Sequence, residues 1–187
     1  MPGSLRCPAS GSRVIARGRS VRVYSLRARG FEVVRACMAG GPTMTLLGGP
    51  PHPGPHHSIG QFRLAGNVLA YLGTTFGVDS GSSTLNVVDV GKRRTLQEIP
   101  VGSYVDAGII SSEAVTELLP TSHGSVAWIA RRSGLHVATL YSVHVAPRAG
   151  APSVLAEGAE IDGGSLALSG HEVSWTDAGT RHSAPMP

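Results

Sequence analysis

Four short stretches of this chain resemble one another, and they decide the fold. They read ARGRSVRV at Ala16–Val23, LAGNVLAY at Leu64–Tyr71, TSHGSVAW at Thr121–Trp128 and LSGHEVSW at Leu168–Trp175. All four align without a gap, which indicates a repeated unit of about 50 residues. A repeat of that length is one supersecondary element stacked on its neighbours.

The alignment identifies two sets of core positions. The aligned apolar residues are Val21, Leu69, Val126 and Val173, which lie 48, 57 and 47 residues apart. The aligned aromatic residues are Tyr71, Trp128 and Trp175. We expect both sets to be buried at equivalent places in successive units, and we interpret the aromatics as core residues rather than ligand-stacking groups.

Between these anchors, apolar and polar residues alternate in short runs separated by Gly turns, which is typical of strands with one buried face. A helix capped by Ser111 or Ser112 is the competing interpretation of residues 107–119, where we prefer strand or loop. Four prolines predict an exposed loop over residues 48–60. The domain boundaries are a tail at 1–12 and one repeat domain at 13–187, with units at about 13–48, 61–102, 115–158 and 161–187.

The pattern resembles the blades of β-propellers, in particular WD-repeat and TolB-like proteins and uncharacterised bacterial exported proteins with degenerate repeats. The resemblance implies an all-β, propeller-like array of about four antiparallel blades. The Trp-Asp pair of WD repeats is absent, because Thr176 separates Trp175 from Asp177. The last unit lacks a fourth strand, so we expect an open or partial ring with an exposed strand edge through which the chain self-associates.

Composition fits one globular domain, with 41% hydrophobic residues in 187 and a formal net charge of +4. The positive charge concentrates before residue 36, yet no series of aromatic side chains accompanies it, which argues against nucleic-acid binding. No apolar run is long enough for a membrane-spanning helix, and no signal peptide is visible. If the protein is exported, we expect either a missing start or another route.

Cys7 and Cys37 are the two cysteines. Two cysteines cannot complete a structural zinc site, which leaves two buried thiols, two reactive thiols or one disulfide. The repeat register favours the disulfide, because Cys7 precedes the first predicted strand and Cys37 lies near the end of the third. A disulfide indicates an oxidising compartment.

Motifs for catalysis, phosphate binding or cofactor binding are absent, and we predict no cofactor. His52, His56 and His57 form a local cluster that is a weak candidate for metal binding, but the predicted loop supplies no carboxylate or thiol, so we predict no metal site. Carboxylates near predicted strand ends are the candidates for catalysis. These are Asp79, Asp89, Asp106, Asp162 and Asp177.

The function predicted from these features is a non-enzymatic, extracytoplasmic binding or scaffolding module. Loops at the ends of a propeller would engage a protein or glycan partner. One alternative is a propeller-type hydrolase or lyase, which requires two of the aspartates to meet in one pocket. The other is a truncated fragment of a larger propeller without independent activity. Fold alone does not choose among them.

Overall fold

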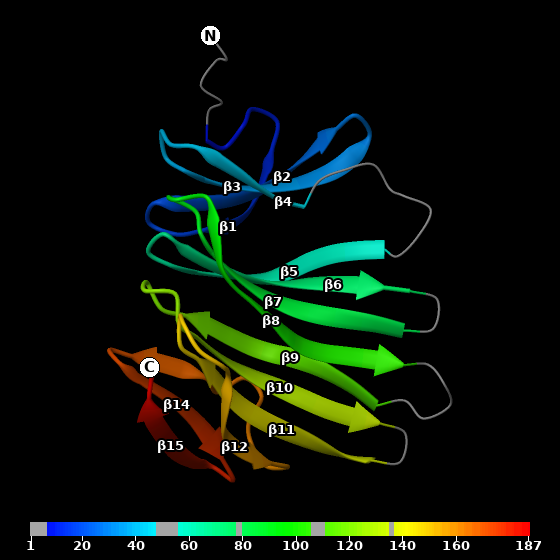
Figure 1. Cartoon of the computed structure of the whole chain (residues 1–187), viewed down its shortest axis with the longest axis vertical. Helices are drawn as coiled ribbons and strands as arrows, with labels where there is room; N and C mark the ends of the chain where they lie inside the picture. Colours follow the sequence, from blue (N-terminus) through cyan, green and yellow to red (C-terminus); the bar gives the residue numbers. More distant parts are fainter. Residues whose placement is uncertain (1–6, 48–55, 78–79, 106–110, 135–136) are drawn as a thin grey trace.

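The computed structural model describes residues 7–47, 56–77, 80–105, 111–134 and 137–187. These residues form fifteen β-strands and no α-helix, which confirms the all-β prediction (Figure 1). The helical interpretation of residues 107–119 was wrong, because Ser111–Pro120 is a strand. The described residues also contain no helix of the length and hydropathy needed to cross a membrane.

Each predicted unit is an antiparallel meander. The first contains β1 (Arg13–Arg17), β2 (Val21–Ala28), β3 (Phe31–Met38) and β4 (Thr43–Leu47). The second contains β5 (His56–Ala65), β6 (Val68–Phe76), β7 (Ser80–Asp89) and β8 (Arg94–Val105). The third contains β9 (Ser111–Pro120), β10 (Val126–Gly134), β11 (Val137–Ala146) and β12 (Ser153–Gly158). The fourth has three strands, β13 (Ala167–Ser169), β14 (Glu172–Asp177) and β15 (Thr180–Pro185).

The second and third units are joined into one eight-stranded sheet. The junction is short, since β8 pairs with β9 at Tyr104 and Ser112. The backbones also approach closely at Gly102, where an added Cβ would lie 2.4 Å from the carbonyl oxygen of Glu113. Nothing in the repeat pattern predicted this junction.

The units stack face to face, and an apolar cluster fills each of the three boundaries (Figure 1). Alternate residues of one strand serve opposite boundaries, because side chains alternate across a strand. On β6, Leu69 and Tyr71 pack toward the first unit, whereas Val68 and Ala70 pack toward the third. This two-sided burial explains the apolar run at the start of β6.

The four predicted apolar anchors are all fully buried, but Val21 is not equivalent to the other three. Leu69, Val126 and Val173 face the preceding unit, whereas Val21 faces the following one. The gap-free alignment was therefore wrong by one residue in the first unit. Val21 corresponds to Val68, because each follows a two-residue hairpin turn.

This correction reveals a fourth member of the aromatic set, Tyr24, which is 0% exposed. In every unit the aromatic lies opposite a planar polar side chain of the next strand. The register pairs are Tyr24 with Arg35, Tyr71 with Asn86, Trp128 with His144 and Trp175 with His182. The Trp128 and His144 rings stack with centroids 4.9 Å apart and an interplanar angle of 3°. The structural repeat is thus an aromatic and its polar cross-strand partner.

The stack does not close into a ring. The first and fourth units lie at its two ends, and their strands make no extensive contact with one another (Figure 1). The outer face of the fourth unit is polar: Arg181 donates a hydrogen bond to Ser174, and Ser183 donates one to Glu172. A polar outer face is stable in water without another sheet against it. A closed propeller is therefore not observed.

The two cysteines form a disulfide, with Cα atoms 5.9 Å apart, which fits the predicted pairing. Cys37 lies on β3 on the face opposite to the first apolar boundary, beside Tyr24 and Arg35. The bridge therefore anchors the segment that begins at Cys7 to the outer face of the first unit.

Candidate ligand-binding cleft

Only some of the residues predicted as metal or catalytic candidates belong to the described part of the chain. His52, Asp79 and Asp106 lie outside the described residues, as does the side chain of His56. His57 lies on β5 rather than in a loop, and its Nδ1 is 3.0 Å from Thr75 Oγ1. Across the described part of the chain, no three His, Cys, Asp or Glu side chains are grouped as metal ligands would be.

The three described aspartates lie at or beside turns. Asp89 lies at one end of the strands, and Asp162 and Asp177 lie at the other. Asp89 accepts a hydrogen bond from the backbone N–H of Lys92 and lies 3.9 Å from its ammonium group. Asp162 accepts a hydrogen bond from the backbone N–H of Gly164. Asp177 ends β14 and bridges to Ile161 through the backbone. Asp162 and Asp177 lie on neighbouring segments, since the backbone N–H of Asp162 donates a hydrogen bond to Thr176, whereas Asp89 lies in another unit. None of the three lines the pockets described below, so the condition for the enzymatic alternative is not shown to be met.

A cleft lies instead between the first and second units, and unequal strand lengths create it. The strands of the first unit have five to eight residues, whereas β5 to β8 have nine to twelve. The described strands of the first unit therefore do not extend over the far halves of β5 to β8 on the side facing them. The β1–β2 and β5–β6 turns lie at one end of the strands, and we use "far end" for the opposite end, where β6 ends and β7 begins.

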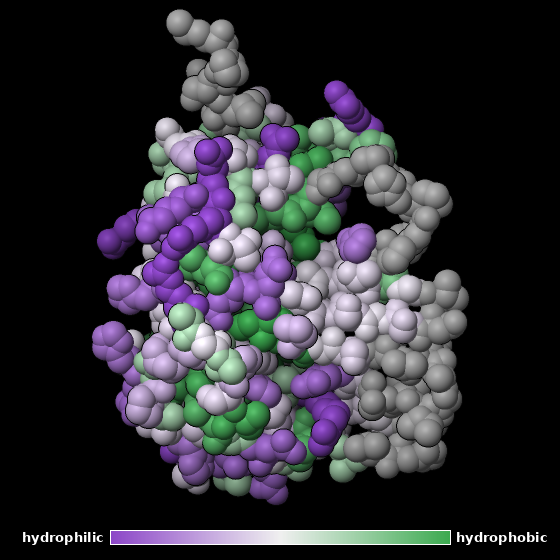
Figure 2. Space-filling view, in the orientation of Figure 1, coloured by the Kyte–Doolittle hydropathy of each residue, from purple (hydrophilic) through white to green (hydrophobic). Residues whose placement is uncertain are grey.

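This face of the second unit carries rows of polar side chains paired across the strands. Tyr71, Asn86 and Glu98 form one row across β6, β7 and β8. His57, Thr75, Ser82 and Ser103 form another row nearer the far end. The pale surface over this half of the second unit in Figure 2 reflects its Ser, Thr and Gly residues. These side chains offer hydrogen-bond donors and acceptors with little net charge.

Gly73 lies between these two rows, and the side chain of Asn86 packs over it. It pairs with Ile59 on one side and Thr84 on the other. A Cβ added there would lie 3.2 Å from the amide nitrogen of Asn86. The amide nitrogen of Asn86 is itself held by a hydrogen bond of 3.1 Å to the carbonyl oxygen of Thr84. The Asn86 amide is therefore held in place over Gly73, within the lining of the cleft.

The cleft has two adjoining lobes with volumes of about 390 and 340 Å3. Leu47, His57, Ser58 and Ile59 line both lobes. The first lobe adds Arg13, Ser25, Glu32 and Phe62, and the second adds Tyr71, Thr84, Asn86 and Glu98. Both volumes lie within the range of small-molecule sites.

An apolar floor lies beneath the polar rim. The rings of Phe62 and Tyr71 stack with centroids 6.1 Å apart, and Leu47 and Ile59 continue this surface. Burial raises the pKa of the Tyr71 hydroxyl, and the negative charge of Glu98 raises it further. Tyr71 is therefore a neutral hydroxyl at physiological pH, able to donate and accept hydrogen bonds.

Sequence reasoning found one part of this cleft and missed the rest. Tyr71 was assigned to the core, where it does pack, and His57 was singled out for metal binding. Asn86, Glu98 and Thr75 were not singled out, because alternation alone cannot show which faces a neighbouring sheet leaves open. Comparison with protein-family models, curated proteins and solved structures finds no match to this chain.

Proposed function

We propose that the protein is a non-enzymatic binding module that holds a neutral oligosaccharide in the cleft between its first and second units. The observation that carries this proposal is the combination of an aromatic and aliphatic floor with an amide, an imidazole, hydroxyls and a carboxylate around it. This places the ligand between two sheets, whereas the sequence favoured loops at the ends of the array.

The chemistry of the cleft suits a sugar. Each sugar hydroxyl both donates and accepts hydrogen bonds, and amide, carboxylate and hydroxyl side chains can satisfy both roles. The carbon-bound hydrogens of a sugar ring form an apolar face that packs against aromatic and aliphatic side chains. Asn86, Glu98 and Thr84 supply the first kind of contact, and Tyr71 and Phe62 supply the second.

Binding is favoured over hydrolysis by the placement of the carboxylates. Glycoside hydrolysis commonly uses two carboxyl groups that flank one bond. In this cleft, Glu32 lines one lobe and Glu98 lines the other, so neither lobe contains a carboxylate pair. The disulfide supports a location outside the cytoplasm, since structural disulfides persist in oxidising compartments.

A screen against immobilised neutral glucose-, mannose- and N-acetylglucosamine-based oligosaccharides tests the proposal, followed by calorimetric titration of the best ligand. Glu98→Gln should weaken binding about tenfold or more, because hydrogen bonds to charged groups contribute about 1.5–3 kcal/mol. Gly73→Val should weaken binding by displacing the Asn86 amide that packs over Gly73. Glu160→Gln removes an exposed carboxylate on a distant turn and serves as the matched control.

Each outcome has a definite meaning. Binding that both cleft variants weaken and the control leaves unchanged supports the proposal. New reducing ends after incubation with the ligand would instead establish hydrolysis and contradict a purely binding role. Failure of every neutral oligosaccharide to bind the folded protein would reject the glycan assignment.

A further inference from the structure

A second pocket, separate from the cleft, lies at the end of the strands opposite to the far end. We call this the turn end, because the β1–β2, β5–β6, β9–β10 and β13–β14 turns meet there (Figure 1). The pocket has a volume of about 530 Å3 and lies where the turns of the second, third and fourth units come together. An added Cβ on Gly66 would lie 3.5 Å from Ser122, which shows how closely two of these turns approach.

The frame of this pocket is fixed by buried hydrogen bonds. Ser125 is 5% exposed, and its hydroxyl donates a bond of 2.6 Å to the carbonyl oxygen of Pro187. The backbone N–H of Arg148 donates to the same hydroxyl at 3.3 Å. The backbone N–H of Met186 donates to the carbonyl oxygen of His171 at 2.7 Å. These bonds tie together the β9–β10 turn, the end of β11 and the β13–β14 turn.

The lining combines an apolar floor with basic side chains. Leu168, Met186 and Ala65 provide the floor, and the titratable side chains of the lining are Arg148, His123 and His171. None of the lining side chains is a carboxylate, and none is Phe, Tyr or Trp. The pocket is therefore complementary to a ligand in which an apolar group has a negatively charged group next to it.

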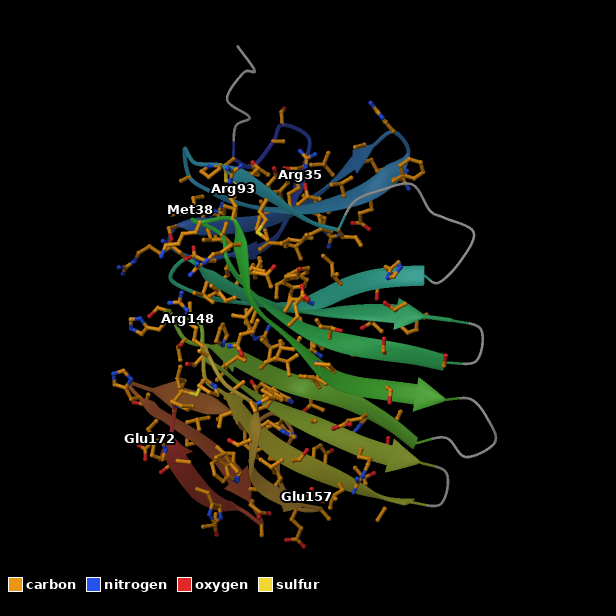
Figure 3. All side chains as sticks on the ribbon, in the orientation of Figure 1. Arg35, Met38, Arg93, Arg148, Glu157 and Glu172 are labelled. Carbon is orange, nitrogen blue, oxygen red and sulfur yellow. A yellow bond between two sulfur atoms is a disulfide. The ribbon has the colours of Figure 1, made fainter. Side chains whose placement is uncertain are left out.

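The basic character continues along the turn end beyond the pocket. Arg19 lies in the β1–β2 turn, and Lys92 and Arg93 lie in the β7–β8 turn. The carboxylates of Asp89 and Glu172 share this end: Asp89 lies 3.9 Å from Lys92, and Glu172 accepts a hydrogen bond from Ser183. Figure 3 labels Arg93 and Arg148, which lie along this same end of the molecule. Figure 2 shows hydrophilic residues in purple along this end. Nearby positive charges of this kind speed the encounter with an acidic partner and orient it.

We propose that the turn end docks an acidic peptide segment of a partner protein, with an apolar side chain of that segment seated in the pocket. The apolar floor selects against a partner that offers charge alone. The size of the pocket suits one large aliphatic side chain and the carboxylates on either side of it.

The test measures fluorescence anisotropy of a labelled peptide of alternating glutamate and leucine, titrated with the whole protein. Arg148→Glu and Arg93→Glu should each weaken binding, the first by about tenfold or more, since a charge-assisted hydrogen bond is lost at the pocket. Arg131→Glu makes the same charge change on the half of β10 away from the turns and is the matched control. Far-UV circular dichroism verifies that each variant is folded.

The proposal is supported if the peptide binds, if Arg148→Glu weakens binding more than Arg131→Glu, and if a glutamate-only peptide binds at least tenfold more weakly. Equal binding of the glutamate-only peptide or of duplex DNA would show attraction by charge alone and overturn it. Equal effects of the variants, or no binding at low salt, would also overturn it. None of these results bears on the cleft, so the two proposals fail separately.

Discussion

Replacing Trp128 by alanine tests the packing between the second and third units. Trp128 is 3% exposed, belongs to the apolar cluster of that boundary and stacks on His144. Truncation of a buried Trp to Ala costs about 3–5 kcal/mol, because transfer energy is lost and a cavity remains. For a chain of this size each kcal/mol lowers Tm by about 2–4 °C, so Tm should fall by roughly 6–20 °C.

Urea unfolding followed by far-UV circular dichroism measures this loss without relying on the substituted tryptophan. Trp128→Phe should lose less than half as much, since an aromatic ring still faces His144. Val154→Ala is the control, because Val154 is 56% exposed and its truncation should change stability by about 0.5 kcal/mol or less. A loss below about 1 kcal/mol for Trp128→Ala would refute this packing.

The remaining predictions concern single residues. Burial lowers the pKa of His144, and the negative charge of Glu157 partly opposes this shift. As the pH falls below about 6.5, the unfolded chain therefore binds a proton at this residue before the folded protein does, and the free energy of unfolding should decrease. Urea titrations at pH 7.5 and 5.5 should show a smaller decrease for His144→Gln. Gly102→Ala should lower the free energy of unfolding by about 1–3 kcal/mol, because the added methyl group forces β8 away from β9. Gly60→Ala should lower it less, because no atom lies within 4 Å of an added Cβ there. Equal Tm shifts for the two variants would contradict the close approach of β8 and β9 at Gly102. The Tyr24 hydroxyl is buried without a hydrogen-bond partner in the described structure, so Tyr24→Phe should raise stability by about 1 kcal/mol, and a comparable loss would contradict this.

The strands were predictable because their signal is local. Alternation and Gly turns indicated short strands with one buried face, which the structure contains, and the repeat indicated stacked units. The first unit shows where local pattern fails. Arg19 and Ser20 form a two-residue turn, and the one-residue shift that follows hides Tyr24 from the aligned aromatic set. Only the register of β2 with β3 reveals its equivalence.

The cleft was not predictable, because it depends on the difference in strand length between the first and second units. Asn86 and Glu98 follow the same polar alternation that a fully solvated strand shows. Their placement in a hollow follows from the shorter strands of the first unit, which end before they cover these residues. The joining of β8 to β9 is equally a consequence of tertiary packing, and a single pair of residues marks it.

The central claim is that the cleft between the first and second units binds a neutral oligosaccharide. At 19.3 kDa, the protein is within reach of amide chemical-shift mapping by NMR. Titration with the best oligosaccharide from the screen should shift the amides of His57, Gly73, Asn86 and Glu98 and leave those of the turn-end pocket, such as Ser125 and His171, unchanged. Shifts confined to the turn end, or scattered without reference to the cleft, would contradict the account.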